Sequence, residues 1–490
     1  MPAEGAAFLA DESAAEQLRG VFAEHGYDER RVRERLGGTD INRLSQKSLP
    51  RFLALTSEGA PLDILIRLFV LRVCVSEAEA VRALSPIDLV SWIGNGVLVF
   101  RDECIQSLIR IRPFAGRLLA FDPSDSTFRF DHVLGPGRAS IELHNATMRI
   151  PFGRALDLGT GCGVQGLGCA LHCGQVVCTD VNPRALALAK FNSRLNGAAN
   201  IEFRSGSLFE PVGSEIFNLI LMNMPYAISP DVRFLFRDAG DGGDEFLQRL
   251  IREAPAHLAP GGFCLMTAQW AQTDDEPWRA RLWKWFRELP FDVWILRQST
   301  QTAASYAENW IAETERPGDA KRWQDWMEYL HRLHIEAIHT GIICLRRRER
   351  GAGWFSITDD IATIPPGSGD DLLAGFGLRD FLSALRNDVE LLNHSYRVSP
   401  KTRISQTSEP AERGWRTTKI ILRNHGGLPF ACKIDGHVLA LILKLNGTQT
   451  LDEVIDQFAS DAQIDWAPLT EHVVSMARSL IEQGFLLPAT

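Results

Sequence analysis

Three alternating glycines, Gly159, Gly161 and Gly163, are the residues of this sequence that point most directly to chemistry. They follow the mostly apolar segment 155–158 and precede small and apolar residues, which predicts a strand, a tight loop and a helix. Glycine permits positive φ and close approach of the backbone to a ligand, and the first amide N–H groups of a helix lack intrahelical partners. The pattern therefore predicts a loop that binds a polar or anionic ligand. Because Gly161-x-Gly163-x-x-Gly166 also fits the dinucleotide fingerprint, the loop alone leaves the ligand open.

Two carboxylates and a second loop narrow the choice of ligand. Asp180 ends the next predicted strand, where a carboxylate binds ribose hydroxyls in nicotinamide enzymes and in S-adenosylmethionine (SAM) enzymes alike. Asp157 stands before the glycines, at a position where SAM enzymes commonly carry an acidic residue. The predicted strand 217–222 ends in Asn223-Met-Pro-Tyr226, which brings polar, rigid and aromatic groups to the carboxyl end of that strand. Ligands bind at this edge of an open α/β sheet, so the sequence favours SAM.

The same segments resemble the class I SAM-dependent methyltransferases that carry an Asn-Pro-Pro-Tyr motif. That group includes the release-factor glutamine N5-methyltransferases and the ribosomal RNA guanine-N2 methyltransferases. The resemblance covers roughly residues 128 to 348 and rests on the segments 157–163, 179–186, 207–210 and 223–226. The layout of the whole chain also resembles a three-part group of bacterial methyltransferases. The resemblance implies SAM as cofactor, S-adenosyl-L-homocysteine as product, and methyl transfer to a nitrogen atom.

The resemblance also assigns roles in cofactor binding. The three glycines would admit the methionine part of SAM, with Asp157 near its ammonium group. Asp180 would bind the ribose hydroxyls, and Ser207 and Leu208 would lie beside the adenine. The complete implied cofactor set is Asp157, Gly159, Gly161, Gly163, Asp180, Asn182, Ser207, Leu208 and Asn223.

The catalytic set implied by the resemblance is Asn223, Met224, Pro225 and Tyr226. The side-chain oxygen of Asn223 and the carbonyl of residue 224 would accept hydrogen bonds from the acceptor N–H and aim its lone pair at the methyl group. Tyr226 would offer a flat face to a planar group. Neither a metal nor a covalent nucleophile is needed.

Met224 departs from the motif, which has proline at that position. Proline fixes φ and lacks an N–H, so methionine loosens the loop and returns a donor to it. We expect the flexible thioether of Met224 to form part of the acceptor pocket. Substitution by proline is then expected to raise the KM for the acceptor and leave the KM for SAM unchanged.

Three hypotheses for function follow. The leading one is methylation of a nitrogen in a small molecule or in a peptide or protein side chain. The second is methylation of an RNA or DNA base, which the net charge of −9 disfavours, because polyphosphate partners favour a basic protein. The third is a nicotinamide-dependent oxidoreductase, which the segment 223–226 and the lack of an evident hydride-transfer site disfavour.

Composition limits the remaining possibilities. No apolar run in the 490 residues reaches the length of a membrane span, and the first residues have neither the basic region nor the apolar core of a signal peptide. We therefore expect a cytoplasmic protein with no membrane partner. Cys162, Cys169, Cys173 and Cys178 lie near the glycine loop without a Cys-x-x-Cys pair, so we interpret them as buried thiols and not as metal ligands.

The elements that must position these residues form an α/β fold. We expect a Rossmann-like, doubly wound, seven-stranded sheet at 126–350, with strands at 154–158, 175–180, 201–206, 217–222, 262–268, 291–297 and 341–347. A winged-helix-like region is expected at 1–125, with helices near 76–84 and 86–93 and strands at 97–101, 107–111 and 118–121. It could bind nucleic acid or a partner, but we favour a structural lid. A connector at 351–412 and a small winged-helix-like domain at 413–490 complete the prediction.

Overall fold

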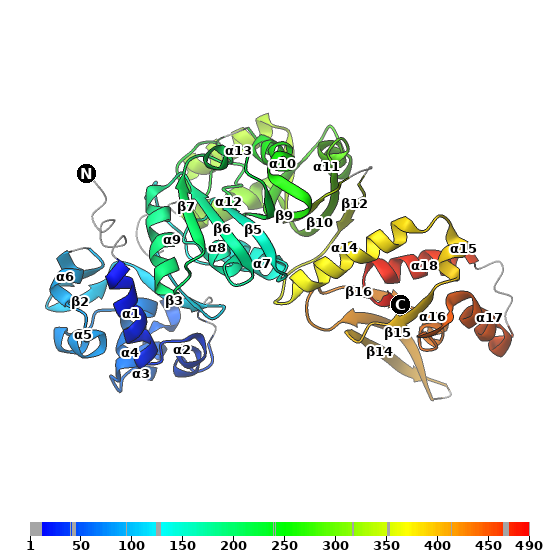
Figure 1. The fold of residues 1–490 in the computed structure, drawn as a ribbon, viewed down its shortest axis with the longest axis horizontal. Coiled ribbons are helices and arrows are strands. Elements are labelled where there is room, and N and C mark those ends of the chain that lie inside the picture. Colours follow the sequence, from blue (N-terminus) through cyan, green and yellow to red (C-terminus); the bar gives the residue numbers. More distant parts are fainter. Residues whose placement is uncertain are drawn as a thin grey trace. The chain divides into compact units, whose positions relative to one another are not determined.

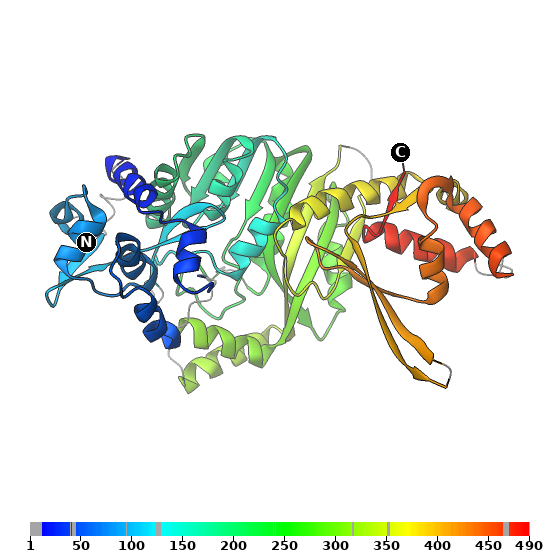
Figure 2. The same cartoon turned by 90° about the horizontal axis from the view of Figure 1, so that it is seen from below.

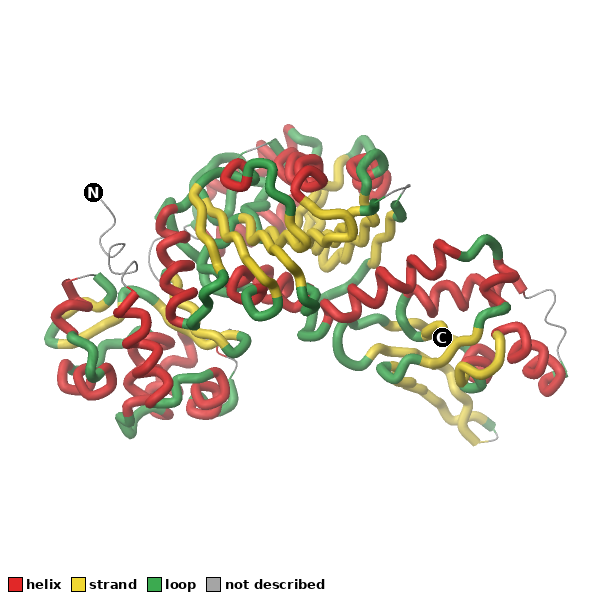
Figure 3. Tube along the Cα trace, in the orientation of Figure 1, coloured by secondary structure: helices red, strands yellow, loops and turns green. Residues whose placement is uncertain are grey.

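The computed structural model describes residues 12–39, 41, 46–94, 96–123, 129–238, 240, 242–315, 318–349, 353–412, 414–463 and 470–489. The chain divides into two compact units, of which the first contains 1–144 and 150–360 and the second contains 145–149 and 361–490. Figure 1 shows the order of the elements along the chain, and Figure 3 shows which segments are helices, strands or loops.

An eight-stranded sheet forms the centre of the first unit, in the order β12-β10-β11-β9-β8-β5-β6-β7. Its strands are β5 (Phe152–Leu158), β6 (Cys173–Asp180), β7 (Ile201–Ser205), β8 (Phe217–Met222), β9 (Leu258–Thr273), β10 (Phe291–Thr302), β11 (Ile335–Arg347) and β12 (Phe355–Thr358). Within this sheet, β11 runs antiparallel to its neighbours β9 and β10, and the other neighbouring strands are parallel. The expected α/β architecture is therefore confirmed, but the sheet is only mostly parallel, and the seven expected strands are joined by an eighth, β12, parallel to β10.

Helices separate the strands in sequence, as a doubly wound sheet requires. They are α7 (Arg138–Ala146), α8 (Val164–Cys169), α9 (Pro183–Leu195), α10 (Glu245–His257), α11 (Trp278–Phe286), α12 (Ala303–Thr314) and α13 (Ala320–Arg332). A single turn of 3-10 helix, η5 (Glu210–Val212), precedes β8. In the tryptophan-rich segment that forms α12 and α13, Trp326 is buried, Trp310 packs against the same apolar cluster, and Trp323 is exposed.

The first part of the chain is mainly helical. Its helices are α1 (Glu12–Glu24), α2 (Glu29–Arg35), η3 (Gln46–Ser48), α3 (Leu49–Leu55), α4 (Pro61–Leu65), the π-helix η4 (Ile66–Leu71), α5 (Glu77–Leu84) and α6 (Leu89–Gly94). Two antiparallel hairpins follow, β1 (Leu98–Arg101) with β2 (Cys104–Ser107) and β3 (Arg110–Phe114) with β4 (Arg117–Phe121). Cys74 and Cys104 form a disulfide, whereas the other described cysteines are thiols.

Two local predictions in this region are wrong. The predicted strand 107–111 spans the turn between β2 and β3, because a run of β-formers gives no sign of where a hairpin reverses. The predicted helix 86–93 begins only at Leu89. The N–H groups of Val90 and Ser91 donate to the carboxylate of Asp88, so Asp88 caps the helix at this later start.

Described residues between 12 and 121 share a hydrophobic core with the sheet domain. Leu18 and Phe22 of α1 belong to the same buried cluster as Leu188 and Phe191 of α9. The side chain of Asn192 accepts a hydrogen bond from Ala120 N (2.7 Å) and donates one to Ala120 O (2.9 Å), so it pairs with β4 as a neighbouring strand would. Burial of this apolar surface joins α1 and β4 to α9.

The second unit contains α14 (Ser368–Ala384), α15 (Asp388–Leu392), β13 (Ser395–Val398), β14 (Thr402–Ala411), β15 (Gly414–Asn424), β16 (Ala431–Ile434), α16 (Gly436–Ile442), β17 (Asn446–Thr450), α17 (Leu451–Ala462), α18 (Thr470–Glu482) and β18 (Leu486–Pro488). Its strands form two sheets, β17-β13-β18 and β14-β15-β16, and Figure 2 shows the long β14–β15 hairpin extending from the unit. The segment 351–412, predicted as a connector, instead contains β12, α14, α15, β13 and β14, because α14 buries Leu372 and Phe376. In the described part of the chain, no helix is long and apolar enough to span a membrane.

Candidate functional site

The loops that carry the predicted site residues meet at one edge of the central sheet. Strands β6, β5 and β8 are parallel neighbours, and Leu158 at the end of β5 pairs with Thr179 on β6 and with Met222 on β8. The three strands therefore end at the same level. The loops that follow them lie side by side, at the edge where open α/β sheets bind ligands.

The three glycines of the loop after β5 all have positive φ, +69° at Gly159, +55° at Gly161 and +86° at Gly163. A Cβ atom at Gly161 would meet nothing within 4 Å, so the loop backbone borders open space there. A Cβ at Gly163 would lie 3.3 Å from the Cβ of Ala189, so this glycine lets the loop pack on α9. Gly161 thus leaves room for a ligand to approach the backbone, and Gly163 allows the loop to pack closely on α9.

The buried side chain of Asp157 accepts hydrogen bonds from the glycine loop and from the helix that follows it. The side chain is 1% exposed, and its Oδ2 accepts hydrogen bonds from Thr160 Oγ1 (2.7 Å) and Gly166 N (2.8 Å). Burial raises the pKa of Asp157 to about 6, although these two hydrogen bonds oppose the shift. The carboxylate is therefore engaged by the loop itself.

Asp180 stands at the end of β6 beside the glycine loop. Its Oδ2 accepts a hydrogen bond from Gly161 N (2.9 Å), and its Oδ1 accepts one from Asn182 N (2.8 Å). Burial raises the pKa of Asp180, and the backbone hydrogen bonds from Asn182 and Gly161 lower it. The backbone N–H of Gly206 donates to Asp180 O (3.2 Å), which brings the segment with the exposed Ser207 and the half-buried Leu208 to the same place.

Asn182 was predicted among the cofactor-binding residues, but both ends of its side chain are engaged within the protein. Its Oδ1 accepts a hydrogen bond from Arg184 N (2.9 Å) and so caps α9. Its Nδ2 donates to Asp131 O (2.9 Å). The side chain is 4% exposed, so it fixes the loop after Asp180 from within the protein.

Asn223 follows the end of β8 and is held from two sides. Its Nδ2 donates to Ser140 Oγ on α7 (2.9 Å), and its Oδ1 accepts a hydrogen bond from Thr267 Oγ1 on β9 (2.8 Å). An amide oxygen has two lone pairs, so Oδ1 can accept a second hydrogen bond beside that from Thr267. Neither Ser140 nor Thr267 was identified from the sequence, because no local pattern marks a hydroxyl that reaches another segment.

The side chain of Met224 lies over the glycine loop. A Cβ built on Gly159 would come within 2.4 Å of the Met224 sulfur, which places this thioether directly against Gly159. Met224 also packs on the apolar cluster that contains Met222 and Met266. The expectation that Met224 belongs to the acceptor pocket therefore needs revision, since its side chain faces the loop assigned to the cofactor.

Tyr226 is half-buried in an acidic environment. Burial raises the pKa of its hydroxyl to about 12, and the negative charges of Glu313 and Glu142 add to this shift. Glu142 on α7 is 7% exposed, and it accepts hydrogen bonds from Arg138 Nε (3.1 Å) and Gln298 Nε2 (2.6 Å). The tyrosine therefore stays neutral at physiological pH and keeps its hydroxyl as a donor.

The chain after Tyr226 is fixed by the tryptophan-rich segment. The N–H of Ile228 donates to the hydroxyl of Tyr306 on α12 (2.9 Å), which in turn donates to Gln269 Oε1 on β9 (2.6 Å). The N–H of Ala227 donates to Arg237 O (3.0 Å), and the buried Arg237 side chain pairs with Asp238 at 2.6 Å. These contacts give the loop a rigid base although it has no regular structure of its own.

The sequence of the chain is similar to those of known methyltransferases. Residues 140–276 match the family described as "Methyltransferase small domain", while 24–107 and 374–488 match two domains of unknown function. The chain is 32% identical over 199 residues to the release factor glutamine methyltransferase of Geobacter sulfurreducens, which covers 38% of this chain and 67% of that protein. It is 32% identical over 144 residues to the ribosomal protein uL3 glutamine methyltransferase of Bradyrhizobium diazoefficiens, which covers 27% of this chain and 44% of that protein. Among solved structures, the ribosomal protein L11 methylase of Lactobacillus delbrueckii subsp. bulgaricus aligns with 18% identity over 47% of this chain and 95% of that chain, with a TM-score of 0.27.

Proposed function

Because the chain belongs to the class I SAM-dependent methyltransferases of the N5-glutamine type, we propose that its methyl acceptor is the side-chain amide nitrogen of a glutamine in a protein. The proposal rests above all on Asn223. Its amide is held between Ser140 and Thr267 at the carboxyl end of β8, beside the glycine loop. A fixed carbonyl oxygen at this place can accept a hydrogen bond from an acceptor N–H.

The residues around the glycine loop fit the cofactor. Open space borders Gly161, and the carboxylate of Asp180 lies within hydrogen-bond distance of that loop. We assign Asp180 to the ribose hydroxyls and the segment at Ser207 and Leu208 to the adenine. We assign Asp157 and Asn182 to holding the loops, since both side chains are engaged within the protein. SAM supplies an electrophilic methyl group when bound, and the protein supplies orientation.

The chain's own groups then position the acceptor. Oδ1 of Asn223 and the carbonyl of residue 224 accept the two N–H groups of the glutamine amide, which raises electron density on the nitrogen. The neutral ring of Tyr226 stacks on the planar amide. These groups would hold the acceptor nitrogen opposite the carbon–sulfur bond of SAM, so that the nitrogen–carbon bond would form as that bond breaks. S-adenosyl-L-homocysteine would leave, and one proton of the nitrogen would pass to solvent. Near-attack positioning of this kind accounts for a large part of the rate of a bimolecular transfer.

We assign residues 12–121 the role of a structural cover over α9, in place of a separate binding module. The shared core of α1 and α9 and the pairing of Asn192 with β4 support this assignment. The winged-helix-like arrangement expected for this region stays a prediction of the sequence. The domain boundaries near residues 125 and 350 remain predictions of the sequence.

The experiment that tests the function is methyl transfer from deuterated SAM to purified release factors and ribosomal proteins, read by mass spectrometry of peptides. We expect one labelled methyl group on a glutamine side chain with the wild-type protein, and labelling that is slower by about 100-fold or more with Asn223→Ala. Label on an RNA supplied in the same reaction, with no label on protein, would instead support base methylation. Label on a lysine or arginine would contradict the amide acceptor.

A further inference from the structure

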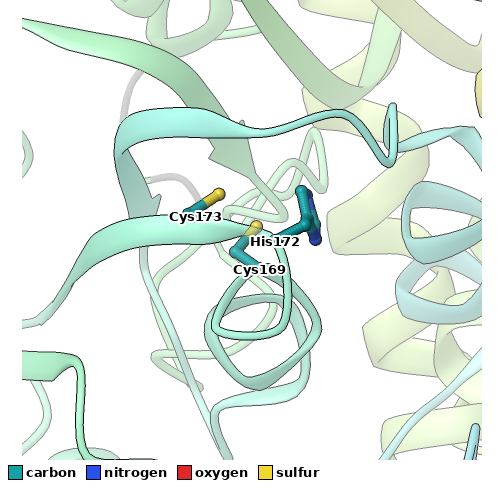
Figure 4. Close-up of side chains that lie close together, drawn as sticks. All are labelled: Cys169, His172 and Cys173. Atoms are coloured by element: carbon teal, nitrogen blue, oxygen red, sulfur yellow. The ribbon is translucent and has the colours of Figure 1, made fainter.

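A second cluster of chemically active side chains lies where α8 ends and β6 begins. Cys169 is the last residue of α8, His172 lies in the turn, and Cys173 is the first residue of β6. One potential ligand atom from each of the three lies within 4.8 Å of the other two. Figure 4 shows the two sulfur atoms and the imidazole gathered around this turn. Asp180 lies at the opposite end of β6, so the cluster is separate from the glycine loop.

Backbone hydrogen bonds fix the turn that brings these side chains together. The N–H of His172 donates to Cys169 O (3.0 Å), and the N–H of Phe152 at the start of β5 donates to His172 O (3.2 Å). The side chain of Asn200 donates to Ala170 O (3.1 Å) and to Cys173 O (2.9 Å). The arrangement is therefore built into the fold before anything binds to it.

The ring nitrogens of His172 are evidence that this cluster binds a ligand. Its Nδ1 and Nε2 are both shielded from solvent, and neither has a hydrogen-bond partner among the described residues. A shielded polar atom without a partner is costly, and each such atom in a folded protein calls for an explanation. A bound metal ion would satisfy one ring nitrogen, since neutral imidazole is a common metal ligand.

We propose that Cys169, His172 and Cys173 bind a thiophilic divalent cation of the Zn²⁺ class. Two thiolates and one imidazole form a donor set that such ions prefer, and a water or an outside ligand can take the fourth position. In a tetrahedral zinc site, metal–sulfur bonds of about 2.3 Å place neighbouring sulfur atoms about 3.8 Å apart. The ligand atoms all lie within 4.8 Å of one another. The two sulfur atoms therefore need to approach by about 1 Å at most, and each sulfur and the imidazole nitrogen, about 3.6 Å apart in such a site, by about 1.2 Å at most.

The position of the cluster indicates a structural role for the ion. The ion would join the end of α8 to the start of β6, at the end of that strand opposite Asp180. Binding to the folded protein and not to the unfolded chain stabilises the fold by mass action. Binding also deprotonates both thiols, so protons are released as the ion enters.

The proposal is tested with the full-length protein, reduced and freed of metal by a chelator, and titrated with Co²⁺. We expect thiolate-to-cobalt absorption that saturates at one Co²⁺ per chain, displacement of this signal by Zn²⁺, and a higher melting temperature with Zn²⁺ present. Cys169→Ser and Cys173→Ser should each weaken Co²⁺ binding by about 10-fold or more, as should His172→Gln. SAM binding should be the same with and without the ion.

Matched controls separate this site from the other thiols. Cys178→Ser removes a nearby buried thiol, and the double variant Cys74→Ser/Cys104→Ser removes the pair that reduction would liberate. Both should keep the full cobalt signal, and the melting temperatures of all variants in chelator should match that of the wild type. Absence of thiolate-to-cobalt absorption at one equivalent, or its loss only in the Cys74 and Cys104 variant, would overturn the proposal.

Discussion

The glycine loop after β5 and the Asn223 loop after β8 lie at the same edge of the sheet, yet different contacts hold them. The glycine loop is held by residues close to it along the chain, with Asp157 bonded to Thr160 and Gly166. Asn223 is held by Ser140 and Thr267, which come from distant segments. The first loop is thus a local structure, whereas the second depends on hydrogen bonds to side chains of α7 and β9.

This difference predicts a separation of effects between two substitutions. Asn223→Ala should lower kcat by about 100-fold or more, because it removes an acceptor that acts on the substrate N–H, and it should leave the Kd for SAM nearly unchanged. Asp180→Ala should weaken SAM binding by about 10-fold to 150-fold, because it removes charge-assisted hydrogen bonds worth about 1.5–3 kcal/mol. Calorimetry with SAM and steady-state kinetics measure both effects.

The exposed Asn309 on α12 supplies the control, since Asn309→Ala removes an asparagine far along the chain from either loop. It should change neither constant. If Asn223→Ala and Asp180→Ala both weakened SAM binding equally, the two loops would form one cofactor site, and the assignment of Asn223 to the acceptor would be wrong.

A smaller effect is expected when the supports of Asn223 are removed. Ser140→Ala and Thr267→Val each delete one hydrogen bond, worth about 0.5–1.5 kcal/mol, so each should lower kcat by about 2-fold to 12-fold. If both act only by orienting Asn223, neither substitution should lower the residual rate of the Asn223→Ala variant further. Additive losses in that background would show that the hydroxyl groups contact the acceptor themselves.

The contrast between local and long-range contacts also explains which residues could be predicted from the sequence. The glycine loop, Asp180 and the strands of the sheet follow from local patterns, because each depends on neighbouring residues and strand periodicity. Ser140, Thr267 and Tyr306 were missed because their roles depend on contacts between residues 37 to 83 positions apart. The cluster at His172 was missed for a related reason, since the thiols were considered by pairwise spacing alone and the imidazole between them was not.

Substitution of Asp157 tests whether its side chain stabilises the glycine loop and does not contact the cofactor. Burial raises its pKa to about 6 from a usual value of 3.8, so protonation of Asp157 favours the folded state. Its contribution to stability is fully present below about pH 3.8 and is lost as the pH rises through about 6. Asp157→Asn removes this dependence and should raise the stability at pH 7.5, by up to roughly 3 kcal/mol, with SAM binding largely kept.

Thermal unfolding from pH 4 to 8 measures the first effect, and calorimetry with SAM measures the second. The carbonyl of asparagine can still accept from Thr160 and Gly166, so the loop should persist. A large loss of SAM affinity in Asp157→Asn, with the loop's stability intact, would show that the carboxylate contacts the cofactor directly.

The smallest expected effect concerns Met224, whose sulfur lies against Gly159 and so joins the two loops. Met224→Ala empties the space over Gly159 but keeps the backbone carbonyl of residue 224, so the KM for SAM should rise by a factor of about 2 to 5 while kcat changes little. Gly159→Ala should instead crowd this space, because its Cβ would lie 2.4 Å from the Met224 sulfur. The backbone φ of +69° adds strain for a residue with a side chain. If the contact is what couples the loops, Met224→Ala should partly restore SAM binding to Gly159→Ala, leaving only the cost of the left-handed backbone. A KM for the acceptor that rises while the KM for SAM stays constant would instead place the thioether in the acceptor pocket, as the sequence alone suggested.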